Sequence, residues 1–144
     1  MDHTEKMDIY EAEVAKLPQL PVPVIHRFTE GMYIREVRVP AGVVFTSRTH
    51  KTQHPFVLSY GVATIVDQTG SNTIVAAPHT GITEAGTRRI FVTHTDIVLT
   101  TFHVTDLTDP DEWVELNTEM TNNLLPQGFA QNCFEGRQKL KWQP

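Results

Sequence analysis

The chemistry that this sequence could perform centres on its histidines. The 144 residues contain seven of them, and imidazole nitrogens bind divalent zinc, iron, nickel and copper. Four are assigned no role because they fall in a terminus, a proline-rich connector or turns: His3, His26, His79 and His94. The other three lie on segments predicted as strands or strand ends. They are the candidate metal ligands: His50, His54 and His103.

The spacing of His50 and His54 suits two arms of a hairpin. The sequence around them predicts a strand, a turn and a second strand, so their rings can converge across the turn. Two ligands are too few for a tight site, since catalytic zinc sites usually take three protein ligands. His103, on a late strand, is the candidate third. Both alternating faces of the segment 97–104 are apolar enough to point inward, so the sequence leaves the direction of His103 open.

Short β-strands are the elements that must position these residues. Apolar and β-branched runs alternate with turn signals between Met32 and Val104. Strands at roughly ten-residue spacing are typical of a sandwich or barrel. No helix-length amphipathic segment interrupts them, which argues against βαβ units. The predicted strands are 32–39, 43–50, 56–66, 73–78, 88–94 and 97–104.

Helical patterns flank the strands. Helix formers with apolar residues at helical spacing predict a short helix over 4–17, and Pro18 ends it. The proline-rich stretch 18–28 is expected to be an extended connector or an edge strand. Asp109 as N-cap begins a second predicted helix over 110–124. The chain divides into an N-terminal helix and arm (1–31), a barrel (32–106) and a C-terminal helix and tail (107–144).

Composition limits the classes of function. The length fits one domain, and a formal net charge of −5 argues against nonspecific nucleic-acid binding. No apolar run approaches the roughly 20 residues that span a bilayer, and the N-terminus lacks the apolar stretch of a secretory signal. Cys133 is the only cysteine, so no intrachain disulfide forms. The expectation is a soluble cytoplasmic protein with no membrane and no nucleic-acid partner.

The spacing around the first two candidate ligands resembles the first motif of the cupin superfamily. Gly42 is followed by five residues and then by the three positions 48–50, and six residues separate His54 from Gly61. In the family these positions hold a His-x-His pair, a glutamate and a closing glycine. Here Arg48 takes the first ligand position, His50 the second, and His54 stands in place of the glutamate.

The second cupin motif is preserved only in its spacing and in Gly86. Arg89 replaces the last metal-binding histidine of the family, and Thr93 replaces its asparagine. The resemblance covers about residues 31–106. Among cupins the chain is most similar to small proteins of bacteriophages and prophages, through the segments HKTQH (50–54), GTRR (86–89) and TTFHVTDLTDPDE (100–112). That likeness implies a phage or prophage origin and a location in the host cytoplasm or the virion.

The resemblance implies an all-β, cupin-type jelly-roll barrel with short N- and C-terminal helices, in which the strand of His103 runs beside the strand of the first motif. Arg48 and Arg89, if they point inward, oppose a cation and favour an anion, since guanidinium groups bind carboxylate or phosphate. These histidines and arginines allow three interpretations: a divalent-metal site, a metal-free ligand pocket, or histidines that only make internal hydrogen bonds.

The leading hypothesis is a small cupin that binds zinc, iron, nickel or manganese through His50, His54 and His103 and holds a small anionic molecule through Arg48 or Arg89. No acidic base is evident at a suitable position, so the sequence names no reaction. The rival hypothesis is a non-enzymatic phage accessory or structural protein that uses the barrel as a scaffold. In that case four aromatic residues would anchor contacts between subunits, and the alternative is that they pack against the chain's own barrel: Trp113, Phe129, Phe134 and Trp142. A homodimer is expected in either case.

Overall fold

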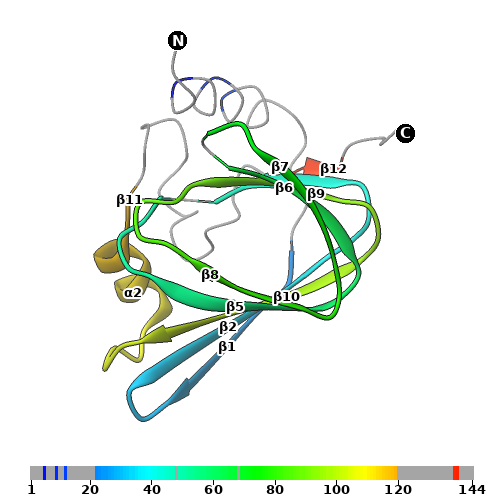
Figure 1. The fold of residues 1–144 in the computed structure, drawn as a ribbon. Helices are drawn as coiled ribbons and strands as arrows, with labels where there is room; N and C mark the ends of the chain where they lie inside the picture. Colours follow the sequence, from blue (N-terminus) through cyan, green and yellow to red (C-terminus); the bar gives the residue numbers. More distant parts are fainter. Residues whose placement is uncertain are drawn as a thin grey trace.

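Two antiparallel sheets face each other and enclose the core (Figure 1). The computed structural model describes Glu5, Ile9, Ala12 and residues 22–47, 49–67, 69–119 and 138–139. The first sheet has the order β1 (Val24–Thr29), β2 (Met32–Val39), β10 (Ile97–Val104), β5 (His54–Tyr60), β8 (His79–Thr83). The second has the order β12 (Gln138–Lys139), β3 (Val43–Thr46), β9 (Arg89–Thr93), β6 (Val62–Asp67), β7 (Asn72–Ala76).

The chain passes repeatedly from one sheet to the other, as in a jelly roll. It runs from β2 in the first sheet to β3 in the second, back to β5, and again to β6. A separate pair, β4 (Thr49–His50) with β11 (Thr118–Glu119), joins the helix α2 (Pro110–Asn117) to the barrel. The all-β jelly-roll prediction is confirmed.

Inward side chains from both sheets form the core. Phe45 and Phe91 stack with ring centroids 4.8 Å apart, and Val37, Leu58 and Leu99 pack in the same cluster. On β10 the odd-numbered residues face inward. Ile97, Leu99 and His103 are buried, whereas the side chain of Val104 is 87 % exposed. The direction that the sequence left open for His103 is therefore inward.

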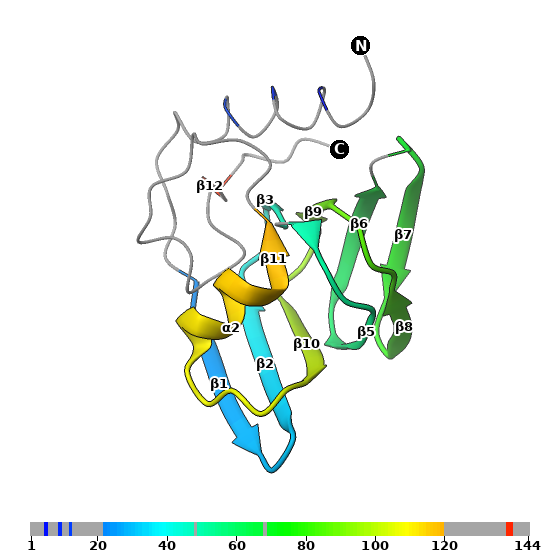
Figure 2. The same cartoon turned by 90° about the vertical axis from the view of Figure 1, so that its left-hand side faces the viewer.

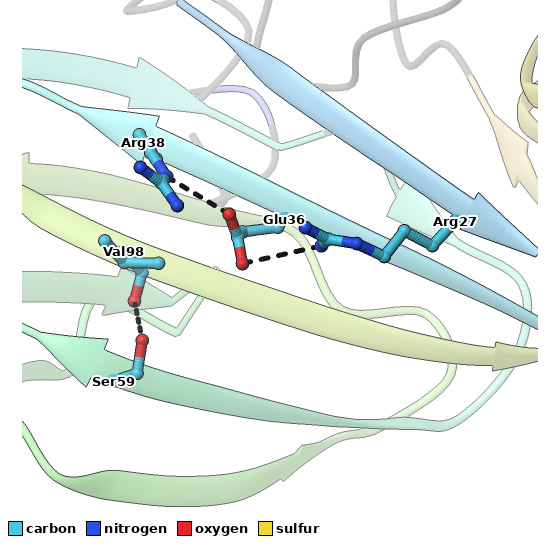
Figure 3. Close-up of polar contacts among 5 residues, drawn as sticks. All are labelled: Arg27, Glu36, Arg38, Ser59 and Val98. Atoms are coloured by element: carbon cyan, nitrogen blue, oxygen red, sulfur yellow. Dashed lines mark hydrogen bonds and ion pairs between the residues drawn. The ribbon is translucent and has the colours of Figure 1, made fainter.

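The outer face of the first sheet carries charged side chains (Figure 3). The carboxylate of Glu36 lies 3.1 Å from Arg38 Nε and 3.7 Å from Arg27 Nη1. Ser59 Oγ donates to the carbonyl oxygen of Val98 at 3.5 Å. These charged side chains mark the solvent side of the sheet. Exposed ion pairs of this kind contribute little to stability.

Four predicted strands match single observed strands within two residues at either end: 32–39, 73–78, 88–94 and 97–104. The prediction of one strand over 56–66 is wrong, because Gly61 divides it into β5 and β6. Gly61 has φ +92°, and a Cβ there would lie 2.0 Å from the carbonyl oxygen of Asp96. Only glycine fits this conformation in this space. The predicted strand 43–50 is likewise two elements, β3 and β4.

The flanking segments are confirmed in part. The stretch 18–28 was expected to be a connector or edge strand, and β1 lies at the edge of the first sheet. Strand β8 was not predicted; its first residue, His79, was assigned to a turn and is instead a half-buried strand residue. In the predicted helix 4–17 the described residues are helical, and the others lie outside the described part. No helix among the described residues is long and apolar enough to cross a membrane.

The C-terminal helix begins as predicted and ends earlier. Asp109 caps α2, and its Oδ1 accepts from the amide of Asp111 at 2.9 Å. The helix ends at Asn117, because Thr118 and Glu119 form β11 instead of continuing the predicted helix 110–124. Leu116, predicted on the buried face, is 64 % exposed. Positions 120–124, Cys133 and the tail aromatics lie outside the described residues.

Candidate functional site

The three predicted ligands lie together in the interior. His50, His54 and His103 come from β4, β5 and β10, and they are 8 %, 3 % and 3 % exposed. The ring centroids of His50 and His54 are 4.6 Å apart, and those of His54 and His103 are 4.4 Å apart. The remaining pair, His50 and His103, is 6.2 Å apart. We call these three residues the histidine cluster.

Backbone contacts hold the two arms that carry His50 and His54. In β4, His50 pairs with Thr118 of β11, and its carbonyl oxygen accepts from the amide of Gly86 at 2.8 Å. After the three residues 51–53, strand β5 begins at His54, which pairs with Thr83 of β8. The predicted convergence of the two rings across the turn is thereby explained: each arm is fixed by a different neighbouring strand.

Burial favours the neutral form of His54 and His103. The pKa of His103 is lowered to about 2, first by burial and then by the positive charges that His54, His50 and Arg35 carry when protonated. Burial also lowers the pKa of His54, with a smaller contribution in the same direction from Arg89, and the Thr52 carbonyl opposes this shift. A neutral imidazole keeps one nitrogen lone pair for a ligand. His54 and His103 can therefore act as neutral electron-pair donors to a ligand.

A buried ring nitrogen of His103 has no hydrogen-bond partner among the described residues. His103 Nε2 lies 2.8 Å from Thr101 Oγ1, whereas Nδ1 has no hydrogen-bond partner among the described residues. If Nε2 carries the proton and donates to Thr101, Nδ1 presents its lone pair to the interior. A buried polar atom left without a partner costs about 1–3 kcal/mol. A ligand at this nitrogen would remove that cost.

The donor types fit a divalent metal, but the side-chain arrangement does not. No group of three or more His, Cys, Asp or Glu side chains in the described part of the chain is arranged to hold an ion. The ring planes of His50 and His54 are inclined by 59°, and those of His54 and His103 by 51°. Metal binding at the cluster therefore requires the rings to reorient.

Arginine borders the same interior space. A small inner cavity of about 30 Å³ is lined by His50, His54 and Arg89, together with hydroxyl and apolar side chains. Arg89 Nη1 donates to Thr83 Oγ1 at 3.1 Å, and among the described residues Arg89 forms no ion pair. Burial lowers its pKa, which the charge of Asp67 opposes. No carboxylate is among the described residues that line this inner cavity, so it favours an anion. Arg48 lies outside the described residues.

Sequence reasoning missed the residues that enclose the cluster. Trp113 of α2 is 1 % exposed, and its ring centroid lies 4.1 Å from that of His103. Tyr33 packs against both, at 5.1 Å from Trp113 and 5.7 Å from His103. Figure 2 shows α2 alongside β2, next to β11. The helical pattern placed Trp113 on a buried face, but only the β4–β11 pairing brings that face over His103.

Two residues assigned to other roles also change. Trp113, named as a possible anchor between subunits or as a residue packed on its own barrel, is buried against Tyr33 and Val114 of its own chain. His26, taken as a bystander, lies with Nδ1 2.6 Å from the hydroxyl of Tyr33. Arg35 was not singled out; it is buried on β2, and its charge acts on His103.

Solved structures of other proteins share this architecture. The chain is similar to ectoine synthase from P. lautus with a TM-score of 0.57 and 9 % identity, over 72 % of this chain and 78 % of that one. The Cnp3 cupin domain of Schizosaccharomyces pombe gives a TM-score of 0.50 and 16 % identity, over 61 % and 67 %. Salicylate 1,2-dioxygenase from Pseudaminobacter salicylatoxidans gives 0.52 and 13 %, over 69 % of this chain and 32 % of that one.

At these identities the likeness concerns the fold alone. No protein-family model and no curated protein matches the sequence. The sheet topology and the structural neighbours agree with each other. The chain has the cupin-type jelly-roll fold.

Proposed function

We propose that this protein binds a divalent metal ion through His50, His54 and His103, and a small anionic ligand through Arg89 beside it. The observation that carries the proposal is the cluster itself: three buried imidazoles in mutual contact, one with a nitrogen that has no hydrogen-bond partner among the described residues. Zinc, iron, nickel and manganese are the candidate ions. A bound ion would polarise the ligand or activate a water.

The charges at the site explain why a metal ion and an anion would bind together. Arg89 brings positive charge to the rim of the inner cavity, and no carboxylate is among the residues described there. A divalent ion beside it needs a compensating anion, because uncompensated charge in a buried site is costly. Arg89 would hold that anion. The matching role predicted for Arg48 stays a prediction.

A metal-free anion pocket is the second candidate. It is favoured by the absence, within the described ranges, of a side-chain group arranged for an ion. In that case Arg89 and the Thr83 hydroxyl would hold the anion, and the histidines would contribute hydrogen bonds. The homodimer, the phage origin and the scaffold role of the barrel remain predictions from the sequence.

Metal analysis separates these candidates. Untagged protein dialysed against zinc should retain about one ion per chain, as expected for three protein ligands. A His50→Ala/His54→Ala double variant should retain none. The control is His79→Ala, which removes a histidine of β8 outside the cluster and should leave the zinc content unchanged. Zinc in the double variant at the wild-type level would contradict the proposal.

Trp113 provides an independent readout. Its ring lies against His103, so a paramagnetic ion such as Ni²⁺ or Cu²⁺ bound at the cluster should quench its fluorescence. The second tryptophan is removed with Trp142→Phe, so that the signal has one source. Quenching that saturates and is lost in His103→Gln supports the proposal. Protein that retains no zinc and shows no saturable quenching by Ni²⁺ or Cu²⁺ refutes the metal site and leaves the anion pocket.

A further inference from the structure

A second, larger cavity lies next to the inner one. It has a volume of about 530 Å³ and is bordered by residues of β5 to β9. Strands β7 and β8 are the last strands of their sheets, so the two sheets do not pair along this side. Figure 2 shows both strands on the same side of the barrel. The two cavities share Phe56, Thr87 and Arg89 as walls.

Phe56 lies between the two cavities, and the absence of a side chain at Gly81 leaves space for its ring. Its ring lies against Gly81 of β8, where an added Cβ would be 2.7 Å from the nearest ring carbon. The guanidinium carbon of Arg89 lies 5.4 Å from the same ring centroid. The arginine is thus held at the junction, with its charge available to the outer cavity as well as to the inner one.

The sizes of the two cavities suit a ligand with a small head group and a larger body. The inner cavity has a volume of only about 30 Å³, so it admits only a small group. The outer cavity falls within the roughly 300–1,000 Å³ of small-molecule sites. A ligand that uses both places a small anionic head at Arg89 and the rest of the molecule between β7 and β8.

The lining of the outer cavity is rich in hydroxyl groups. Five side chains supply them, each able to donate and accept: Thr69, Ser71, Thr73, Thr80 and Thr87. Apolar side chains line the cavity as well: Phe56, Ile65, Val75 and Ile82. Such a mixed lining suits a body that carries hydroxyl groups around an apolar carbon ring.

Two carboxylates also border the cavity, and both have protein partners. Asp67 Oδ1 accepts from the amide of Ser71 at 3.1 Å and from Thr69. Glu84 Oε2 accepts from Gln53 Nε2 at 2.8 Å. Each carboxylate keeps further acceptor capacity, which the hydroxyl groups of a ligand can use. The cavity therefore combines one cationic side chain, Arg89, with two carboxylates, and the charge of Asp67 partly offsets that of Arg89. An anionic group of a ligand is favoured only at Arg89, and its hydroxyl groups are favoured at the carboxylates.

We infer that the outer cavity binds a polyhydroxylated carboxylic acid of about the size of a hexuronate, with its carboxylate at Arg89 and its hydroxyl groups on the threonine and serine side chains. This names the chemical class of the anionic ligand and so rests on the proposed function. It depends on Arg89 and not on an ion in the histidine cluster.

Calorimetric titration of the full chain tests the inference with three probes. D-glucuronate has both the carboxylate and the hydroxyl groups, D-glucose lacks the carboxylate, and hexanoate lacks the hydroxyl groups. Each is titrated with chelator and again with zinc. D-glucuronate should bind at least about tenfold more tightly than the other two, since each lacks one set of charge-assisted or neutral hydrogen bonds. Equal binding of all three, or none of D-glucuronate in both conditions, overturns the inference.

Matched variants locate the site. Arg89→Gln should lower the affinity for D-glucuronate by about tenfold or more, and Thr73→Val should lower it by about threefold. Thr73 is exposed at the cavity, so this second variant keeps the fold. Thr100→Val is the control, because Thr100 lies on β10 and lines neither cavity. Unchanged affinity in both cavity variants overturns the assignment.

The outcome is separable from that of the metal site. Protein that retains zinc but fails to bind D-glucuronate refutes the ligand class and leaves the metal site standing. Protein that binds D-glucuronate without retaining zinc refutes the metal site and supports the ligand class.

Discussion

Buried His103 should make the stability of the metal-free protein depend on pH. Its pKa is about 2 in the folded protein and 6.5 in the unfolded chain. Between these values the unfolded chain binds a proton that the folded protein does not. Stability is therefore complete above about pH 6.5 and falls as the pH is lowered toward 2. Protonation opposes folding over this whole window.

The magnitude follows from the same pKa. At pH 5.0 the unfolded His103 is almost fully protonated, 1.5 units below its ordinary pKa of 6.5. The free energy of unfolding should then be about 2 kcal/mol lower than at pH 7.5 from this residue alone. His54, whose pKa is also lowered by burial, adds to the fall with the same sign.

Urea unfolding in the presence of chelator, at pH 7.5 and 5.0, measures this difference. His103→Gln removes the titrating ring, so its loss of stability between the two pH values should be about 2 kcal/mol smaller than that of the wild type. Thr101→Val is the control. It removes the hydroxyl beside His103 Nε2 but keeps the buried imidazole, and should keep the wild-type pH dependence. Equal losses in His103→Gln and the wild type would refute the reasoning.

Three further substitutions test the framework around the site by urea unfolding. Gly61→Ala should destabilise the fold by at least about 2 kcal/mol more than Gly31→Ala, since both have positive φ but only the first meets backbone; equal losses would contradict this. Asp109→Ala should cost about 1 kcal/mol by uncapping α2, with a red shift of Trp113 emission; an unchanged midpoint would exclude the cap. Thr93→Val should cost about 1–3 kcal/mol, because it leaves a buried carbonyl and amide without their partner; a loss below 0.5 kcal/mol would contradict this.

The strands were predictable where one alternating pattern fills one strand. The segments 32–39 and 97–104 match β2 and β10 to the residue. The segment 56–66 was not resolved because its apolar run continues through Gly61. The buried positions are even-numbered before the glycine, at Phe56 and Leu58, and odd-numbered after it, at Ala63. That change of parity marks the passage from one sheet to the other, and it is visible only once burial is known.

The grouping of the three histidines was predictable from the sequence, whereas their surroundings were not. Spacing across a turn was enough to pair His50 with His54. The inward direction of His103 depended on which face of β10 the second sheet covers, and both faces are apolar. Trp113 reaches His103 because Thr118 leaves the helix to pair with His50. A contact that depends on a two-residue strand far along the chain leaves no periodic signal in the sequence.

Anomalous X-ray scattering from crystals of the zinc-soaked protein tests the central claim most directly. The account predicts one strong peak at the zinc edge between the rings of His50, His54 and His103, with nitrogen atoms at about 2.0–2.1 Å from it. Zinc-saturated crystals with no peak among these three rings, or with zinc only at surface residues, would contradict it.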